Sequence, residues 1–312
     1  MTSLVIRTLL DAIAAVPYLL GFHPSRSLVV IGFDGSMPGS CAARLDLPAC
    51  EAAERTAAVL AGHGFRRALL LGYGPADEVG ESAAAMHAAL GSAGVTVAEA
   101  ARVADGRYWP LTPDCPEEGV PYDVSASTIA AEATFAGRVV LADRDELVRS
   151  VQPLDGPARA AMRRATQRAE LSEPGDDPVA LLDRVLARAH VGVLATDEEV
   201  ARLGVHLADL RVRDEAWLRL DEDDPAADIV FWRDVLRRVE ERYAPAPASL
   251  LAYAAYSGGD GGLANVALER ALNADPSYTM AVLLHEVMDA GVPPSKLNKC
   301  RTRDRQHHQE AS

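Results

Sequence analysis

One histidine, His23, occupies the best-defined corner of the sequence, between the apolar residues 18–22 and the short polar stretch 24–27. Because imidazole changes charge near neutral pH, a histidine in such a corner can act as a general base or orient a ligand. The structural interpretation is that its ring nitrogens bond backbone groups in a tight turn. The sequence identifies no carboxylate partner for it, so His23 is a catalytic candidate, with Arg26 beside it as a binding candidate.

A second candidate is the tripeptide Arg107-Tyr108-Trp109, in a stretch crowded with Gly and Pro between residues 105 and 122. A guanidinium beside two aromatic rings can clamp a planar or anionic ligand, and long ordered loops on rigid scaffolds often carry function. The alternative is that these side chains anchor the loop to a sheet. Glu118 lies in the same loop and is the other catalytic candidate, although a pairing with Arg107 would simply hold the loop shut.

Two weaker patterns favour structural interpretations. Residues 72–74 read Gly-Tyr-Gly before a predicted helix, where backbone amides can hold a phosphate. Pro75 removes one of those donors and Asp77 places negative charge there, so we interpret the site as an ordinary helix start. A row of arginines at helical spacing favours a solvated helix face over a contact with an acidic partner. Its members are Arg159, Arg163, Arg164 and Arg168.

Composition narrows the classes of partner. A formal charge of −14 over 312 residues disfavours nucleic acid and anionic lipid, because both require clustered positive charge. The four cysteines have neither CxxC nor zinc-ligand spacing, which favours free thiols in a reducing cytosol. The acidic run 221–224 lacks the turn glycine of a calcium loop. We therefore predict no metal and no cofactor, and neither nucleic acid nor membrane as a partner.

The apolar N-terminus is not a targeting segment. Arg7 and Asp11 interrupt it, Pro17 breaks it, and no basic region leads it. No apolar run is long enough to span a membrane. The expected location is the cytoplasm.

The first half of the chain alternates strand-like and helix-like segments, which predicts an α/β domain over residues 1–150 with a mixed sheet and flanking helices. A hairpin at Asp34-Gly35 makes the sheet mixed. The predicted strands cover 28–33, 40–47, 67–71, 94–103 and 138–141, and the predicted helices cover 8–16, 49–62, 77–90 and 125–135. The segment 105–122 is predicted to be a long loop or lid.

Strand signals nearly vanish after residue 143, which predicts an all-helical domain over 151–294. The polar tail 295–312, with His307 and His308, is predicted to be disordered and too flexible for a metal site. Helices are expected at 143–151, 157–170, 178–190, 196–208, 211–219, 226–243, 247–256, 263–273 and 278–290.

The residues around His23 resemble a known family. Residues 14–24 (AAVPYLLGFHP), followed by Ser27-Leu28-Val29-Val30, are similar to the actinobacterial DUF4192 family, a domain family without an assigned function. Shorter matches lie at 46–48, 106–109 and 118–121. The resemblance covers most of the chain and implies no activity.

Residues 247–280 resemble a single tetratricopeptide-type helix pair, with Gly259-Asp260, Ala264, Ala271 and Pro276 at similar spacing. The early aromatic residue of that repeat is absent, and no second repeat precedes it. Because stacked repeats need about three copies for stability, we expect this pair to cap the helical domain.

The sequence favours a non-enzymatic cytosolic module that binds a protein partner or a small ligand. The alternative is a hydrolase-type enzyme of unknown substrate, with its site at the His23 corner and the 105–121 loop. Whether the chain is an enzyme stays open, as does its oligomeric state. The alternative requires His23 to lie close to that loop, and it fails if His23 and Arg107 lie on opposite sides of the sheet.

Overall fold

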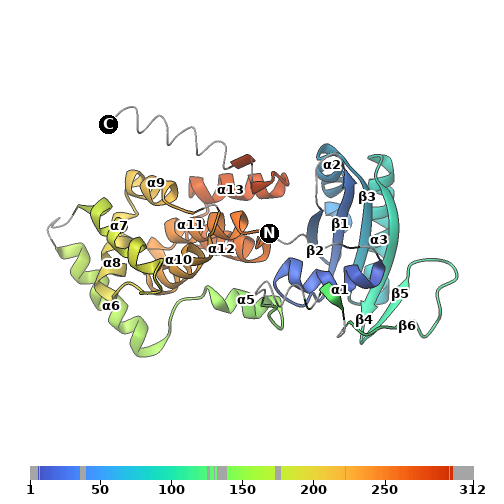
Figure 1. Cartoon of the computed structure of the whole chain (residues 1–312), viewed down its shortest axis with the longest axis horizontal. Coiled ribbons are helices and arrows are strands. Elements are labelled where there is room, and N and C mark those ends of the chain that lie inside the picture. Colours follow the sequence, from blue (N-terminus) through green and yellow to red (C-terminus); the bar gives the residue numbers. More distant parts are fainter. Residues whose placement is uncertain are drawn as a thin grey trace. The chain divides into compact units, whose positions relative to one another are not determined.

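The computed structural model describes residues 6, 8–35, 40–124, 127–129, 131, 139–172, 177–221, 223–294, 296 and 297. It contains two compact units, Met1–Arg144 and Asp145–Ser312. The first is a mixed α/β unit and the second is built from helices, which confirms the predicted fold class (Figure 1). The boundary between them lies near the start of α5 (Arg144–Ser150).

A six-stranded sheet in the order β2-β1-β3-β4-β5-β6 forms the centre of the first unit. Neighbouring strands are antiparallel except β3 and β4, which are parallel and are joined through α3 (Ala76–Ser92). The hairpin of β1 and β2 therefore makes the sheet mixed, as predicted. The strands are β1 Ser27–Gly35, β2 Cys41–Asp46, β3 Phe65–Tyr73, β4 Thr96–Ala104, β5 Arg107–Pro110 and β6 Val120–Pro121.

One face of this sheet is covered by α3 and by α2 (Ala53–Gly62), which follows the short 3-10 turn Cys50–Ala52. Alternate residues of β1 and β3, such as Leu28 and Leu70, pack against these helices. Gly72 is required in this layer, because a Cβ there would come within 2.2 Å of the Val79 side chain of α3. The Gly-Tyr-Gly pattern at 72–74 thus has a packing role.

Helix α1 (Leu9–Leu20) contacts β3, and Ala14 and Ala15 pack against Ile129 rather than in the core beneath α2 and α3. Thr8 and Asp11 form a capping box at the start of the helix. The prediction that Pro17 ends the helix is wrong: Pro17 lies inside α1, which continues to Leu20 and ends at the left-handed Gly21. Pro17 donates no N–H to the preceding turn, and only one turn of the helix follows it.

The predicted loop 105–122 contains two short strands, β5 and β6, that extend the sheet. Pro110 ends β5 and Pro121 lies in the outermost strand, two places where a strand tolerates a missing N–H. The predicted helix 125–135 falls largely outside the described residues. Of the predicted strand 138–141, Leu141 forms an isolated parallel bridge with Phe22.

The second unit contains the nine predicted helical segments, with one correction. The predicted helix 226–243 is broken, because Val239 is extended and a 3-10 turn, η2 (Glu241–Tyr243), separates α10 from α11. Besides α5, the helices are α6 Gly156–Leu171, α7 Pro178–Ala189, α8 Asp197–His206, α9 Leu210–Leu218, α10 Ala226–Arg238, α11 Pro245–Ser257, α12 Gly261–Ala274 and α13 Thr279–Asp289.

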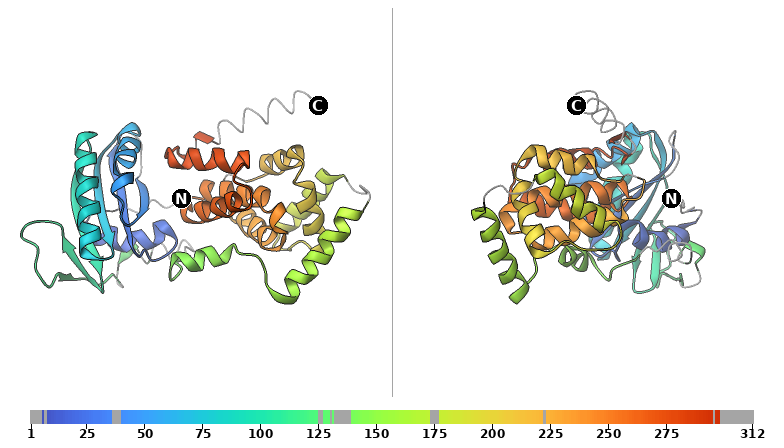
Figure 2. Two further views of the ribbon diagram at one scale, coloured as in Figure 1. Left: turned by 180° about the vertical axis from the view of Figure 1, so that it is seen from behind. Right: turned by 60° about the vertical axis from the view of Figure 1, so that its left-hand side comes forward.

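Helix α11 is the centre of this unit, in contact with α10, α12 and α13 (Figure 2). Every residue of α11 except Tyr256 is buried. Trp232 and Phe231 of α10 and Tyr253 of α11 are the largest fully buried side chains. Within the described part of the chain, no helix combines the length and apolarity that crossing a membrane would require.

Candidate functional site

The His23 corner is held by its backbone. The His23 N–H donates to the Leu141 carbonyl at 3.1 Å, next to the parallel bridge between Phe22 and Leu141. Phe22 is buried, with the Arg44 guanidinium 5.7 Å from its ring centroid. The imidazole is exposed and makes no hydrogen bond or ion pair within the described residues. The ring nitrogens of His23 therefore bond no backbone group of the described residues, although the structural interpretation requires such bonds. No described partner orients the ring as a general base either.

Arg26 links the start of β1 to the first turn of α3. Its Nη2 donates to both carboxylate oxygens of Glu78, at 2.7 and 2.8 Å. Arg26 has a left-handed φ of 40°, and its carbonyl accepts a hydrogen bond from the Leu47 N–H. The guanidinium that we predicted to bind a ligand is thus engaged in an ion pair within the first unit.

The Arg107 and Trp109 side chains hold the Gly- and Pro-rich loop in place. Arg107 Nε donates to the Glu118 carbonyl at 2.6 Å, and its Nη2 donates to the Gly119 carbonyl at 3.2 Å. Trp109 Nε1 donates to the Glu117 carbonyl at 3.2 Å. Arg107 therefore contacts the Glu118 backbone, whereas the Glu118 carboxylate forms no ion pair among the residues described. This is the anchoring arrangement that the sequence left open.

The half-buried Trp109 ring packs against two other groups of the first unit. The Arg102 guanidinium lies 4.3 Å from its centroid, and Arg102 Nε also donates to the Gly74 carbonyl at 3.0 Å. Gly119 packs so closely that a Cβ there would come within 2.5 Å of Trp109 Cε2. A ring in this position stabilises the loop and is not open to a planar ligand.

Tyr108 points to the other face of the sheet, where it meets Tyr122 at a centroid distance of 6.4 Å. Strand pairing places Ser27 directly opposite Tyr73 on that face. The Ser27 Oγ and the Tyr73 hydroxyl are both buried and find no hydrogen-bond partner in the described chain. Burial, reinforced by Tyr122, raises the pKa of Tyr73 above its ordinary value.

The structure does not join His23 to the loop residues. The pairs Gly72–Arg102 and Arg102–Trp109 put Trp109 and Arg107 on the face covered by α2 and α3. His23 follows Phe22, which lies with Arg44 on the opposite face, because Arg44 pairs with Val29. No described hydrogen bond or ion pair connects His23 with Arg107 or Glu118.

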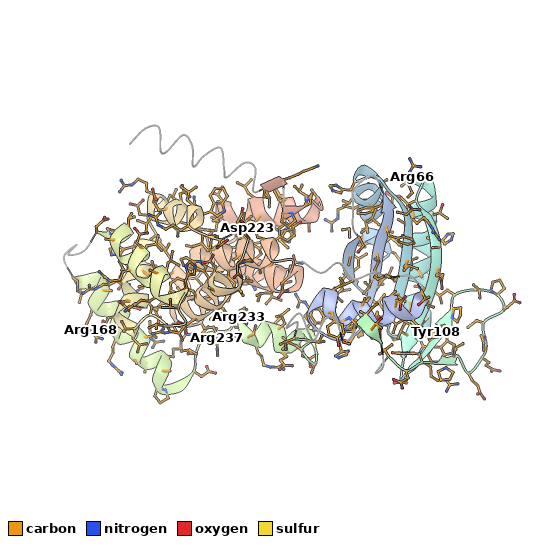
Figure 3. All side chains as sticks on the ribbon, viewed as in Figure 1. Arg66, Tyr108, Arg168, Asp223, Arg233 and Arg237 are labelled. Carbon is orange, nitrogen blue, oxygen red and sulfur yellow. The ribbon has the colours of Figure 1, made fainter. Side chains whose placement is uncertain are left out.

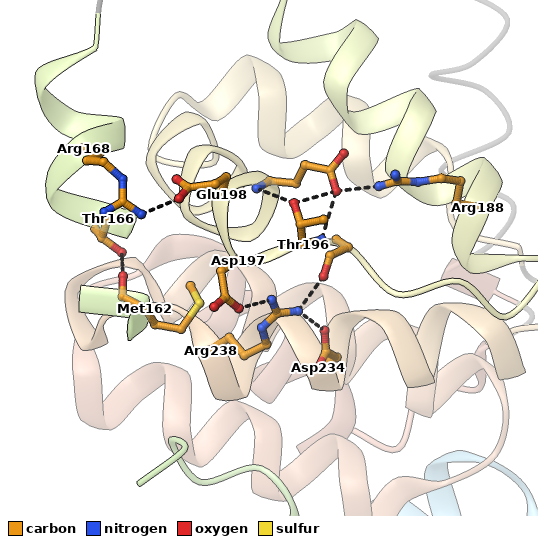
Figure 4. Close-up of polar contacts among 11 residues, drawn as sticks. Met162, Thr166, Arg168, Arg188, Thr196, Asp197, Glu198, Asp234 and Arg238 are labelled. Atoms are coloured by element: carbon orange, nitrogen blue, oxygen red, sulfur yellow. Dashed lines mark hydrogen bonds and ion pairs between the residues drawn. The ribbon is translucent and has the colours of Figure 1, made fainter. Parts of the chain in front are cut away.

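The second unit shows how this chain accommodates a buried arginine (Figure 4). The side chain of Arg238 is 10% exposed. Its Nη1 donates to the Ala195 carbonyl and to Asp234, both at 2.8 Å, and its Nη2 donates to Asp197 at 2.5 Å. Arg238 thus links α10 to the start of α8, with acceptors in place of the lost water.

Arg270 of α12 has no such acceptors. Its side chain is 5% exposed, and Nε, Nη1 and Nη2 are all buried without a hydrogen-bond partner in the described residues. Glu241 is its ion-pair partner, with Oε2 3.6 Å from Nη2, slightly beyond the length of a hydrogen bond. Burial lowers the pKa of Arg270, Glu241 opposes that change, and Arg159 and Arg237 lower the pKa further.

Two of the neighbouring charges are therefore arginines. Arg237 lies one turn beyond Arg233 on α10, where Figure 3 labels both side chains. Arg237 Nε donates to the Gln152 carbonyl at 3.3 Å, and Arg233 Nε is buried without a partner among the described residues. Burial lowers the pKa of Arg233, Asp260 opposes the change, and Arg237 lowers it further. We call the residues Arg159, Arg233, Arg237 and Arg270 the arginine cluster.

The predicted arginine row on α6 divides between two environments. Arg163, Arg164 and Arg168 are exposed, as predicted for a solvated face; Arg163 lies 3.9 Å from Glu240, and Arg168 pairs with Glu198. Arg159 is half-buried and close enough to Arg270 to lower its pKa. The sequence analysis missed Arg270, although it follows Leu263 and Ala267 on the apolar face of α12.

Histidine, cysteine and acidic side chains are the potential metal ligands of the chain. No group of three or more His, Cys, Asp or Glu side chains is placed to hold a metal ion there. Cys41, Cys50 and Cys115 are free thiols, and burial raises the pKa of Cys41. Cys300, His307 and His308 lie outside the described residues.

The family comparison agrees with the resemblance at the His23 corner. Residues 10–295 match the model of a domain of unknown function, DUF4192, so the chain belongs to this family. No curated protein matches the chain. No solved structure matches it either.

Proposed function

We propose that this protein is a non-enzymatic cytosolic module that binds a small ligand or a protein partner, with the binding group in its helical unit. The observation that carries the proposal is Arg270, a buried guanidinium whose three nitrogens have no acceptor in the described chain. A buried charge is costly unless it is paired and hydrogen-bonded. Glu241 is the ion-pair partner described for Arg270. The hydrogen-bond acceptors that Arg270 lacks among the described residues are expected from a ligand or a partner protein.

The first unit supports the non-enzymatic part of this proposal. Arg26 and Arg107 are engaged within the fold, and the Trp109 ring packs against other groups of the unit. The alternative hydrolase requires His23 and Glu118 to meet around one substrate, and no described contact joins them. A general base must reach the proton that it removes, so geometry favours the binding role.

Three further features belong to the proposal. The actinobacterial origin and the cytoplasmic location are expectations from the family resemblance and from the composition. The tetratricopeptide-like character is supported by the close pairing of α11 and α12 and by Asp260, whose carboxylate accepts the Leu263 N–H at the start of α12. We propose that this pair lies at the centre of the helical unit and does not cap it, because α11 is buried and contacts α10, α12 and α13.

The proposal is tested on the full chain purified from its native cell under mild conditions. Native mass spectrometry compares the mass of the folded protein with that of the denatured chain, and a pull-down identifies retained proteins. A retained small molecule or a reproducible partner is expected. An unliganded mass, no reproducible partner and a melting temperature unmoved by a pool of metabolites would together reject the proposal.

A further inference from the structure

We infer that the arginine cluster, Arg159, Arg233, Arg237 and Arg270, is a binding site for a small phosphate-class oxyanion, either inorganic phosphate or a phosphate monoester. This inference rests on the proposed function and names the ligand of the same site.

The first step is the state of Arg270. Arg238 shows that a buried arginine in this unit can be given three acceptors, whereas the three nitrogens of Arg270 have none among the described residues. Glu241 fills this role in part, as an ion-pair partner whose side chain is 51% exposed and whose Oε2 lies 3.6 Å from Nη2. A guanidinium carries five N–H donors, and those of Arg270 have no hydrogen-bond acceptor among the described residues.

The second step is the local charge. The arginines come from three helices, α6, α10 and α12, and Arg163 adds a fifth positive charge near Glu240. The acids that face them are Glu240, Glu241 and Asp260. The basic groups therefore outnumber the acidic ones here, in a chain whose formal charge is −14. A bound anion would remove the repulsion between Arg237 and Arg270.

The helix dipole does not account for this arrangement. Arg237 lies in the last turn of α10, where a positive charge is favourable without any ligand. Arg270 lies outside the last turn of α12 and is buried. Two hydrogen bonds hold Arg237 in place. Its backbone carbonyl accepts the Leu154 N–H at 2.9 Å, and its Nε donates to the Gln152 carbonyl. The segment before α6 thus positions the guanidinium.

The third step selects the ligand. A carboxylate has two oxygens in one plane and matches a single guanidinium fork. A phosphate presents several oxygens in different directions, which suits guanidinium groups from three helices. Polymeric nucleic acid is disfavoured by the net charge of the chain. A small phosphate is therefore the ligand that we infer.

The test uses the full chain and isothermal titration with inorganic phosphate and with glycerol phosphate, against sodium acetate at equal ionic strength. Saturable binding of either phosphate is expected, and the tighter of the two identifies the source. Arg237→Gln and Arg159→Gln should each weaken binding at least tenfold. Arg164→Gln is the matched control, because Arg164 is exposed on the same helix as Arg159; its affinity should equal that of the wild type.

Three results would overturn the inference: no phosphate binding, equal binding of acetate, or wild-type affinity in both Arg237→Gln and Arg159→Gln. Circular dichroism confirms that each variant is folded, and the two half-buried arginines are used because Arg270→Met removes a buried side chain. The broader proposal fails separately. If native mass spectrometry finds a ligand or partner that Arg237→Gln retains, the binding module stands and the arginine cluster is the wrong site.

Discussion

A buried guanidinium is stable only where protein acceptors replace the hydrogen bonds that water would make to it. Arg238 receives one backbone and two carboxylate acceptors, and it joins α10 to the beginning of α8. The first turn of α8 is fixed independently by the Thr196–Glu199 capping box, in which Glu199 also binds Arg188 at 2.5 Å (Figure 4). Arg238 is therefore expected to stabilise the packing of two helices that are already formed.

We expect Arg238→Ala to lower the free energy of unfolding by about 2 kcal/mol, because it leaves Asp234 and the Ala195 carbonyl without their donor. The loss should stay below the upper limit for buried pairs, since Asp197 is half exposed. Urea unfolding measures the change. Arg211→Ala is the control, because the Arg211 side chain is 89% exposed and its removal should change stability little. Equal losses in the two variants would contradict the role of Arg238.

Asp228 predicts a pH effect of definite sign. It is 1% exposed; burial raises its pKa, which the Asp221 N–H and His190 partly oppose. Because the folded-state pKa lies above the unfolded one, ionised Asp228 disfavours folding above that pKa. The cost is relieved as the pH falls through the folded pKa and is gone below the unfolded value of about 3.9. Asp228→Asn keeps an acceptor for Asp221, so it should be more stable than the wild type at pH 7.

This advantage should shrink as the pH is lowered towards 4, which urea unfolding at a series of pH values would show. Asp209→Asn provides a control of opposite sign. Hydrogen bonds from Arg211 lower the pKa of Asp209, so its stabilisation is present above the unfolded pKa and is lost as the pH falls. If Asp228→Asn is less stable than the wild type at pH 7, the predicted cost of burying the ionised Asp228 carboxylate is contradicted.

Among the elements, the 105–121 segment depends on one close contact. Gly119 has a φ of 69°, and any Cβ there would overlap the Trp109 ring. Gly119→Ala should therefore lower the free energy of unfolding by about 2 kcal/mol or more, from backbone strain and the steric clash together. Urea unfolding followed by tryptophan fluorescence measures the loss and reports any exposure of Trp109.

Gly106→Ala separates the two causes. Gly106 has nearly the same φ, 70°, but a Cβ there would meet nothing within 4 Å. It should thus show the backbone cost alone, about 1 kcal/mol. If both variants lose the same stability, the Trp109 contact does not hold the loop.

The comparison of these elements with the sequence shows what local patterns can predict. Helical spacing and Gly or Pro breaks predict the nine helices, because each break is a local backbone preference. β5 and β6 were missed because their prolines indicate a loop, and pairing with β4 is a non-local event. Local patterns also fail to predict the candidate site, because it depends on residues far apart in the sequence. The sequence places Arg159 on a helix face and Arg270 among apolar residues, but only the tertiary fold brings the two charges close enough for Arg159 to affect the pKa of Arg270.

At the scale of the whole molecule, the chain has two cores that are built differently. The core of the first unit lies between a sheet and two helices, and that of the second surrounds α11. The net charge of −14 repels large anions, so a positive group buried in the helical unit is suited to a small anion that is bound at close range.

This organisation predicts that the two units respond separately to perturbation in differential scanning calorimetry of the full chain. Phosphate should raise the melting temperature of one transition, because a ligand that binds only the folded state at 100 times its Kd adds about 2.7 kcal/mol. Gly119→Ala should lower the melting temperature of the other transition. Arg237→Gln should abolish the phosphate effect and leave the effect of Gly119→Ala unchanged, since the two residues belong to different units. A single transition that both perturbations move would show that the units unfold as one, and phosphate binding would then stabilise the sheet as well.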